Sequence, residues 1–205
     1  MATNTKLVRN LRDQLSLNQK QRAILIGTIL GDGYIAGNFK GKNFRLRVEH
    51  CERQKDYVFW KYSIFQEWVL SPPKYRKKTN SWYFRTISHP EITEMRKLFY
   101  QDGRKKIPKN IFSLLKNPLT LAIWFMDDGA MMKRRGCIIN TQSYSYLENV
   151  KLKECLIINF NLTVSLNRDK ENFRLYIHKK SVPGLKKLID KFMLPFMKYK
   201  FPVTP

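Results

Sequence analysis

The hydrophobic pattern of this chain contains two apolar segments that run directly into an aspartate and a glycine. Residues 24–30 lead into Gly31-Asp32-Gly33, and residues 121–126 lead into Asp127-Asp128-Gly129. Apolar side chains on nearly every side predict helices that are buried on more than one face. The pattern therefore predicts two core helices that end at corresponding aspartates, Asp32 and Asp128, which lie 96 positions apart.

Capping residues and small residues support both helices. Gly27 and Gly31 are four positions apart, so they share one stripe on which a second helix can approach closely. The candidate caps are Ser16 with Gln19 or Asn18 with Gln21 for the first helix, and Asn117 followed by Pro118 for the second.

A period of two predicts strands between the helices. Residues 44–50 alternate apolar and polar side chains, which places Arg45, Arg47 and Glu49 on an open face. His50 lies on the apolar side of this strand, so we expect a core or edge histidine rather than a ligand. The other elements expected in this half are a short loop after Gly33, a helix over 55–70, a basic segment at 74–78, a strand over 82–87 and a helix over 90–100.

The same order of elements recurs after Gly129. Each half closes on a lysine, an apolar residue and a proline, and Lys105 and Lys200 are 95 positions apart. The matching offsets predict an internal repeat with units over 1–115 and 116–205. The expected elements of the second unit are a strand over 137–142, a helix over 145–160, strands over 162–168 and 173–178, and a helix over 182–192.

Composition restricts the class of partner. The 205 residues include 39 Lys and Arg against 16 Asp and Glu, a net charge of +23, which indicates a polyanionic partner. A hydrophobic content of 43% predicts a folded core. The longest apolar run is too short to span a bilayer and the first ten residues have no signal-type stretch, so we expect a soluble protein. Three cysteines without CxxC spacing argue against a disulfide framework or a zinc site.

The paired aspartates suggest metal chemistry. A carboxylate at the C-terminal end of a helix adds to the partial negative charge already there, and two such ends are stabilised by a cation. Hard oxygen ligands suit Mg²⁺, and a divalent ion can activate water for phosphodiester hydrolysis. Lys105 and Lys200 are then candidates for stabilising charge on the phosphate or orienting the water. A lone Gly-Asp-Gly after a helix is an ordinary turn, so the inference depends on the joint recurrence of Asp and Lys.

Polar strand faces and basic segments supply a candidate DNA-binding surface. The faces alternate with apolar positions, as in Arg174, Tyr176 and His178 opposite Phe173, Leu175 and Ile177. Such faces can hydrogen-bond to base edges while neighbouring lysines meet phosphates. The candidate residues are Arg45, Arg47, Glu49, Lys74, Arg76, Lys78, Arg85, Lys133, Arg134, Asn140, Gln142, Ser165, Asn167, Arg174, Tyr176 and His178.

At these motifs the chain resembles the single-chain LAGLIDADG homing endonucleases, in particular the branch of the yeast mitochondrial omega-intron enzyme. The strings that carry the resemblance are Trp68-Val69-Leu70-Ser71-Pro72-Pro73, Trp124-Phe125-Met126-Asp127-Asp128-Gly129 and Asn140-Thr141-Gln142-Ser143. The resemblance implies an α+β fold of two pseudo-symmetric αββαββα units, with packed central motif helices and saddle-shaped antiparallel DNA-binding sheets. It also implies Mg²⁺-dependent cleavage of both strands of a long asymmetric site, with short 3′ overhangs.

The resemblance assigns roles residue by residue. Asp32 and Asp128 match the metal-binding aspartates, with Gly31 and Asp127 as further candidate metal ligands. Only Asp128 has the Asp-Gly register of Asp32, so we expect Asp127 in a second shell around the metal or on solvent. Lys105 and Lys200 match the catalytic-pocket lysines. The lysine-apolar-proline triplet alone would choose Lys106 instead of Lys105. The chain departs from the family signature at Thr28, Leu30, Ile123, Trp124 and Met126.

Two other functions are compatible with the pattern. This fold also binds RNA in some relatives, so an intron-splicing maturase is one alternative, and a DNA-binding protein that does not cleave is the other. For the endonuclease we expect a monomer in which Mn²⁺ substitutes for Mg²⁺ and Ca²⁺ binds without supporting cleavage. An intron-encoded eukaryotic protein of this kind would act in the mitochondrion or chloroplast, and otherwise in the cytoplasm.

Overall fold

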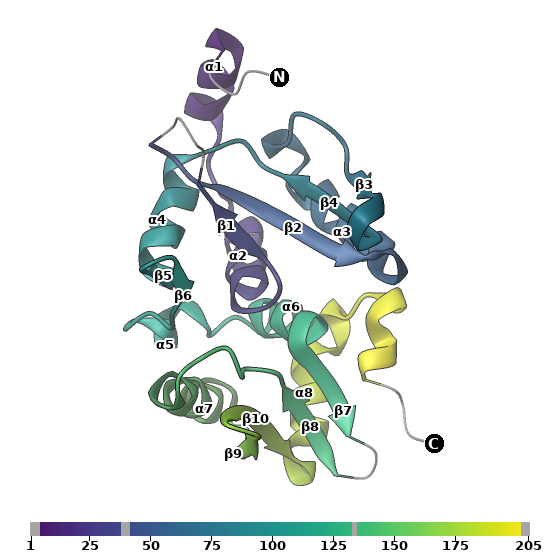
Figure 1. Ribbon diagram of the computed structural model, residues 1–205. Helices are drawn as coiled ribbons and strands as arrows, with labels where there is room; N and C mark the ends of the chain where they lie inside the picture. The colour runs from purple at the N-terminus through teal and green to yellow at the C-terminus, as the bar shows by residue number, and fades with distance from the viewer. Residues whose placement is uncertain (1–4, 38–41, 133–134, 202–205) are drawn as a thin grey trace. The chain divides into compact units, whose positions relative to one another are not determined.

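The structure is a computed structural model that describes residues 5–37, 42–132 and 135–201. The chain forms two compact units, one of residues 1–22 and 32–97 and one of residues 23–31 and 98–205. Each unit contains its own four-stranded antiparallel sheet with helices packed on it (Figure 1). The predicted α+β class is therefore confirmed. The two compact units are defined by contacts in space. The division into repeats over 1–115 and 116–205 is defined by the sequence and stays a prediction.

The first unit is built on a sheet in which β2 and β4 are central. Helix α3 packs on these two strands, and Leu46 and Val48 of β2 are fully buried (Figure 1). The strand order is β1-β2-β4-β3. Its strands are β1 (Tyr34–Ala36), β2 (Arg45–Cys51), β3 (Lys74–Arg76) and β4 (Ser81–Arg85); its helices are α1 (Lys6–Gln14), α3 (Lys55–Ile64) and α4 (Pro90–Phe99), with 3-10 turns at Glu52–Gln54, Gln66–Trp68 and Lys77–Thr79.

The second unit repeats this sheet with the order β7-β8-β10-β9. Helix α7 packs on β9 and β10, and α8 packs against α6 (Figure 1). Its strands are β7 (Gly129–Met132), β8 (Gly136–Ile139), β9 (Val164–Asp169) and β10 (Asn172–His178), with a short ribbon of β5 (Tyr100–Gln101) and β6 (Arg104–Lys105); its helices are α5 (Ile111–Leu114), α6 (Pro118–Asp128), α7 (Tyr146–Phe160) and α8 (Val182–Ile189), with 3-10 turns at Lys179–Ser181, Asp190–Phe192 and Pro195–Lys200.

The matching strand orders confirm the predicted repeat at the level of topology. In both sheets the first strand is at one edge, and the third strand in sequence is at the other edge. All pairs are antiparallel. One four-stranded sheet therefore follows α2 (Gln19–Leu30) in the sequence, and a second sheet with the equivalent strand order follows α6.

Helix α2 approaches α6 closely through the stripe that the sequence marks with glycines. A Cβ atom added at Gly27 would lie 2.6 Å from the Thr120 carbonyl oxygen and 2.7 Å from Ile123 Cβ. The Thr120 hydroxyl donates a hydrogen bond of 3.1 Å to the Ala23 carbonyl oxygen. The side chains of α6 from Leu121 to Met126 are fully buried. Gly27 thus leaves the space that lets the two helix backbones come together.

The helix starts show which candidate caps form. Asn18 and Gln21 form a reciprocal pair, in which the Gln21 backbone N–H donates to Asn18 Oδ1 at 2.8 Å and the Asn18 N–H donates to Gln21 Oε1 at 3.1 Å. Asn117 Oδ1 accepts from the Leu119 N–H at 2.9 Å, as expected for α6. None of the helices in the described part of the chain is long and apolar enough to cross a membrane.

The hydrophobic pattern misses three of the four edge strands, β1, β3 and β7, and finds the fourth, β9. The loop expected after Gly33 contains β1, the basic segment contains β3, and β7 follows α6 directly. These strands have three or four residues, which is too short for a period of two to be visible, and they form because a longer neighbouring strand offers backbone partners. The expectation of a loop at 34–36 is therefore wrong.

The helix expected over 55–70 is also wrong in its length. Helix α3 ends at Ile64, and the Phe65 N–H bonds to the carbonyl oxygens of both Lys61 and Tyr62. This shared bond tightens the chain into the 3-10 turn over Gln66–Trp68. The apolar spacing continues beyond α3 because Phe65, at the end of α3, and Trp68, in the 3-10 turn, are both buried.

We predict that Gly27→Ala lowers the free energy of unfolding by about 1–3 kcal/mol, because the added methyl group has to displace the α6 backbone or Ile123. Urea denaturation measures the change. The matched control is Gly184→Ala in α8, where an added Cβ meets nothing within 4 Å. This control should gain about 0.5–1 kcal/mol from the better helix propensity of alanine. Equal stability of Gly27→Ala and the unmodified chain would contradict the close helix contact.

Candidate functional site

Asp32 lies just beyond the C-terminal end of α2, and its carboxylate is open to solvent. Its side chain is 46% exposed, and Oδ2 lies 3.6 Å from Nδ1 of His50 on β2. The His50 side chain is only 3% exposed. The burial of His50 agrees with the expectation of a core or edge histidine, whereas the expectation that it is not a ligand stays a prediction, and its position beside the aspartate was not anticipated.

Asp128 is the last residue of α6 and is partly buried. Its backbone carbonyl accepts a hydrogen bond of 3.0 Å from the Asn140 N–H. Burial, followed by the negative charge of Asp128, raises the pKa of the Tyr144 phenol above its usual value. The protonated Tyr144 hydroxyl donates to the Leu30 carbonyl oxygen at 3.1 Å. This hydrogen bond ties the last turn of α2 to the segment after β8.

Asp127 lies against Gly31 and is 6% exposed. A Cβ atom added at Gly31 would fall 2.6 Å from Asp127 Oδ2 and closer still to Asp127 Cβ. Only glycine at position 31 leaves room for this side chain. Of the two positions expected for Asp127, the one on solvent is therefore wrong.

The two lysines make equivalent hydrogen bonds. Lys105 Nζ donates to the Gly31 carbonyl oxygen at 2.5 Å, and Lys200 Nζ donates to the Asp127 carbonyl oxygen. Each acceptor is the residue immediately before one of the aspartates, Asp32 and Asp128. The last carbonyl groups of a helix have no partner within the helix and carry partial negative charge, so an ammonium group is favourable there. Each helix end therefore combines one carboxylate and one ammonium group.

Local structure explains how Lys105 reaches its position. Asp102 and Gly103 have positive φ angles of 49° and 78°, which is the backbone of a two-residue hairpin turn between β5 and β6. The turn presents Lys105 opposite Tyr100. The next residue, Lys106, instead donates to Gln101 Oε1 at 3.4 Å. The hydrogen bonds thus favour Lys105 over Lys106 as the counterpart of Lys200.

The open face of the first sheet is strongly cationic. Arg47 is paired in register with Arg85, and Glu49 is opposite Tyr83, which is also opposite Lys74. Residues directly opposite one another share a face of an antiparallel sheet, so these residues and Arg45 lie on the face away from Leu46 and Val48. The predicted alternation of β2 is confirmed.

Glu49 holds the central side chains of this face in place. Its carboxylate accepts from Ser81 Oγ at 2.6 Å and from Arg47 Nη2 at 2.5 Å, and Arg76 Nη1 lies 3.5 Å away. Arg76 also stacks over the Tyr83 ring, 4.7 Å from its centroid. Burial opposes ionisation, but the hydrogen bonds from Ser81 and Arg47 and the charges of Arg47 and Arg76 lower the pKa of Glu49. Glu49 is therefore an anion that orients two arginines.

Arg45, Lys74 and Arg85 line a recess of about 110 Å³. Burial, and then the charges of Arg85 and Arg47, lower the pKa of Arg45, although a guanidinium remains charged at neutral pH. The other lining residues, which carry no charge, are Val8, Leu70, Ser71, Thr86, Ile87 and Ser88. An anionic group such as a phosphate would relieve the repulsion among these three cations.

The open face of the second sheet is more polar than cationic. Arg174 is opposite Asn167, Tyr176 is opposite Ser165, and the alternating residues Leu175 and Ile177 are fully buried. His178 Nε2 lies 3.1 Å from Ser165 Oγ. Tyr176 donates its hydroxyl proton to the Arg135 carbonyl oxygen at 2.6 Å. Arg174 Nη1 is 3.9 Å from Asp169 Oδ2. The side chains of this face form a hydrogen-bonded layer of donors and acceptors.

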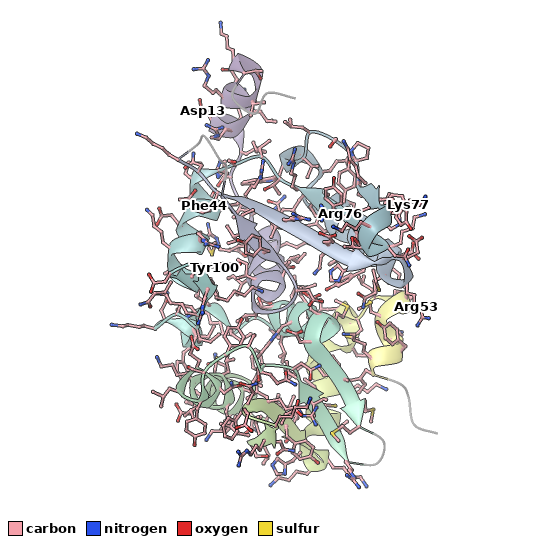
Figure 2. All side chains as sticks on the ribbon, in the orientation of Figure 1. Asp13, Phe44, Arg53, Arg76, Lys77 and Tyr100 are labelled. Carbon is pink, nitrogen blue, oxygen red and sulfur yellow. The ribbon has the colours of Figure 1, made fainter. Side chains whose placement is uncertain are left out.

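The remaining predicted interface residues lie at strand ends or beyond the described segments. Asn140 is exposed just after β8, and Gln142 Nε2 donates to Asp169 Oδ2 at 2.7 Å. Lys78 is exposed in the turn after β3 (Lys74–Arg76), a turn that begins at Lys77 (Figure 2). Lys133 and Arg134 lie outside the described residues.

Sequence reasoning missed the residues that support the site. No charge pattern or recurring offset distinguishes Ser81, Tyr83 and Tyr144 from core and surface residues. The only available signal was His50, a titratable residue at a position where the alternation of β2 calls for an apolar one.

Comparisons with known proteins agree with this geometry. The sequence model of the family described as "LAGLIDADG DNA endonuclease family" matches residues 22–185. The chain is 29% identical to a probable intron-encoded endonuclease of Wickerhamomyces canadensis, over 98% of this chain and 92% of that protein. It is 26% identical to the cytochrome b mRNA maturase bI2 of Debaryomyces hansenii, over 90% of this chain and 74% of that protein. The structure of the homing endonuclease I-WcaI bound to its DNA recognition sequence superimposes with a TM-score of 0.90 at 28% identity, covering 100% of this chain and 96% of that one.

We predict that Glu49→Gln lowers the free energy of unfolding at pH 7 by about 1–2 kcal/mol, because the ionised carboxylate loses charge-assisted hydrogen bonds. The pKa of Glu49 is lower in the folded protein than in the unfolded chain, so its ionised carboxylate stabilises the fold at pH values above the unfolded-state pKa. This stabilisation is lost as the pH falls through the folded-state pKa. Urea denaturation at pH 7 and pH 3 should therefore show a larger difference at pH 7 than at pH 3. Glu94→Gln is the control, since Glu94 is 63% exposed and pairs only with Lys97 in the described structure. A Glu49→Gln effect that persists unchanged at pH 3 would contradict the assignment.

Proposed function

Because this chain belongs to the LAGLIDADG DNA endonuclease family, we propose that it is a homing endonuclease that hydrolyses both strands of one long asymmetric DNA site and leaves short 3′ overhangs. The observation that carries the proposal is the pair of equivalent helix ends. At each end a lysine donates to the carbonyl group directly before an aspartate, Lys105 at Gly31 and Lys200 at Asp127. Two such ends match the two strands that have to be cut.

The aspartates are the proposed metal ligands. Asp32 and Asp128 supply carboxylate oxygens, and the carbonyl oxygens of Gly31 and Asp127 are adjacent oxygen donors. A hard, oxygen-rich donor set of this kind fits Mg²⁺, with Mn²⁺ as a substitute and Ca²⁺ as an ion that binds without supporting cleavage. When bound, the divalent ion supplies an activated water and neutralises phosphate charge.

The lysines are the proposed catalytic cations. Each ammonium group is anchored at a helix C-terminus, so its position is defined before DNA binds. In this role Lys105 and Lys200 stabilise the negative charge that develops on the reacting phosphate or orient the water that attacks it. Because both halves are in one chain, we expect a monomer to cut both strands.

The two sheet faces are the proposed DNA-binding surface. In the first sheet Glu49 orients Arg47 and Arg76 toward fixed positions, as direct readout of base edges requires. The recess of Arg45, Lys74 and Arg85 is suited to a backbone phosphate. The neutral donors and acceptors on β9 and β10 supply the corresponding contacts in the second sheet.

A maturase is the second candidate because one relative is a cytochrome b mRNA maturase. Such a function would use the same cationic faces for RNA, and it would not require Asp32 or Asp128. We also propose that a eukaryotic source would place the protein in the mitochondrion or chloroplast, as an intron-encoded enzyme.

We predict that incubation with a library of long duplexes in Mg²⁺ gives paired, offset breaks at one sequence, whereas incubation in Ca²⁺ gives binding alone. Asp32→Asn and Asp128→Asn should each abolish double-strand cleavage and retain binding, because each removes a proposed metal ligand from one helix end. Sequencing of the new DNA ends and gel-shift titration provide the two measurements. Intact DNA together with tighter binding to intron RNA would instead support the maturase.

We predict that Lys105→Met lowers the cleavage rate constant by about 10²–10³-fold, the usual effect of removing one group that stabilises developing charge. The adjacent Lys106→Met is the matched control and should cut at the unmodified rate, because Lys106 contacts Gln101 rather than a helix end. Single-turnover cleavage with saturating protein separates this effect from weaker binding. A loss in Lys106→Met with normal cleavage by Lys105→Met would show that the roles of these two lysines are reversed.

A further inference from the structure

Strand β2 places a histidine where its alternation calls for an apolar residue. Leu46 and Val48 are fully buried, and His50, the next residue on the same face, is 5% exposed. Burial of a polar ring costs free energy unless its nitrogen atoms find partners. Nδ1 of His50 is directed at the Asp32 carboxylate, the proposed metal ligand of the first unit.

The distance between these two groups suits a shared ion better than a direct hydrogen bond. Nδ1 and Oδ2 are 3.6 Å apart, whereas N–H···O hydrogen bonds span about 2.7–3.2 Å. With metal–ligand bonds of about 2.1 Å, two ligands of one ion are about 3 Å apart at a right angle and about 3.6 Å apart at 120°. The observed distance is about 0.6 Å longer than the right-angle separation of an octahedral ion, so a small rotation of the exposed Asp32 side chain would bring both atoms to one ion.

Neighbouring side chains fix the imidazole in this orientation. Its ring packs on Tyr57 of α3, with the centroids 5.0 Å apart and the planes inclined by 44°. Tyr57 is itself fully buried, and Lys61 Nζ lies 4.2 Å from the centroid of its ring. The histidine is thus held rigidly, while the 46% exposed side chain of Asp32 remains open to solvent.

The second unit has no histidine at the corresponding position. Tyr34 pairs with Arg47 in the first sheet, and Ala130 pairs with Ile138 in the second. Tyr34 and Ala130 each lie two residues after an aspartate, so the counterpart of His50 is Thr141. The Thr141 hydroxyl donates to Asn149 Oδ1 at 2.5 Å. The two repeats therefore differ in donor chemistry beside their aspartates.

We propose that His50 Nδ1 is a ligand of the divalent ion that Asp32 holds, which makes the first metal site a mixed nitrogen and oxygen site. This inference rests on the proposed endonuclease function. Mg²⁺ prefers oxygen ligands, whereas imidazole suits transition metals. The Asp32 site therefore favours Mn²⁺ over Mg²⁺ more strongly than the Asp128 site does.

The direct test is pulsed electron paramagnetic resonance of Mn²⁺ bound to the protein on mixed-sequence duplex DNA. The chain contains three histidines, so ¹⁵N-histidine labelling introduces few label positions and leaves the DNA nitrogen unlabelled. The Asp128→Asn background restricts binding to the first site. We expect a ¹⁵N coupling to Mn²⁺ that is lost in His50→Phe, which keeps a ring against Tyr57, and that persists in His178→Gln.

The outcomes separate this inference from the function on which it rests. Bound Mn²⁺ that is sensitive to Asp32→Asn but shows no ¹⁵N coupling would overturn the role of His50 and leave the endonuclease intact. A ¹⁵N coupling that survives His50→Phe would also overturn it. Mn²⁺ binding that is indifferent to Asp32→Asn would remove the metal site, and with it the proposed function.

A metal-preference measurement provides an independent readout. In His50→Phe the affinity of the Asp32 site for Mn²⁺ should fall by at least about tenfold, and its Mn²⁺ to Mg²⁺ affinity ratio should fall with it. Isothermal titration on the Asp128→Asn background measures both affinities, and circular dichroism verifies that the variant is folded. An unchanged ratio in a folded variant would contradict the proposal.

Discussion

The close contact between α2 and α6 is the constraint on which the rest of the site depends. Gly27 leaves room for the α6 backbone, and Gly31 leaves room for the Asp127 side chain. The contact brings these parts of the two helices together, and one aspartate is the last residue of α6 while the other lies two residues after the end of α2. Because unpaired carbonyl groups concentrate at helix C-termini, both ends also attract ammonium groups. Helix packing and active-site electrostatics are therefore consequences of the same geometry.

The two lysines show that equivalent positions need not come from equivalent local structure. Lys105 extends from a two-residue hairpin turn, whereas Lys200 ends a 3-10 turn. Both reach the carbonyl group before an aspartate. Both sites share the partial negative charge of a helix C-terminus, which favours an ammonium group. The backbone structure around the two lysines is different. The same divergence is visible at His50 in β2 and its counterpart Thr141, which lies two residues after the end of β8.

The sheets differ in how they present polar groups. On the first sheet an ionised Glu49 holds Arg47 and Arg76, and repulsion within the group of Arg45, Arg85 and Arg47 makes the face favourable for anions. On the second sheet a hydrogen bond joins His178 to Ser165, and a ring contact joins His178 to Tyr176. Within the described residues, positive charge is thus concentrated on the open face of the first sheet, and hydrogen-bonding groups are present on both open faces.

Several features can be read from the amino-acid sequence: the two core helices, the alternation of the long strands, the recurrence of Asp and Lys, and the charge that indicates a polyanionic partner. These features are local or periodic, so they are visible without knowledge of the fold. The folded structure was needed to find the short edge strands β1, β3 and β7, which form because a longer strand offers partners. It was also needed to choose Lys105 over Lys106, a choice that depends on the turn at Asp102 and Gly103. It also decided the approach of His50 to Asp32, because residues 18 positions apart meet only when β2 takes its place beside β1 in the sheet.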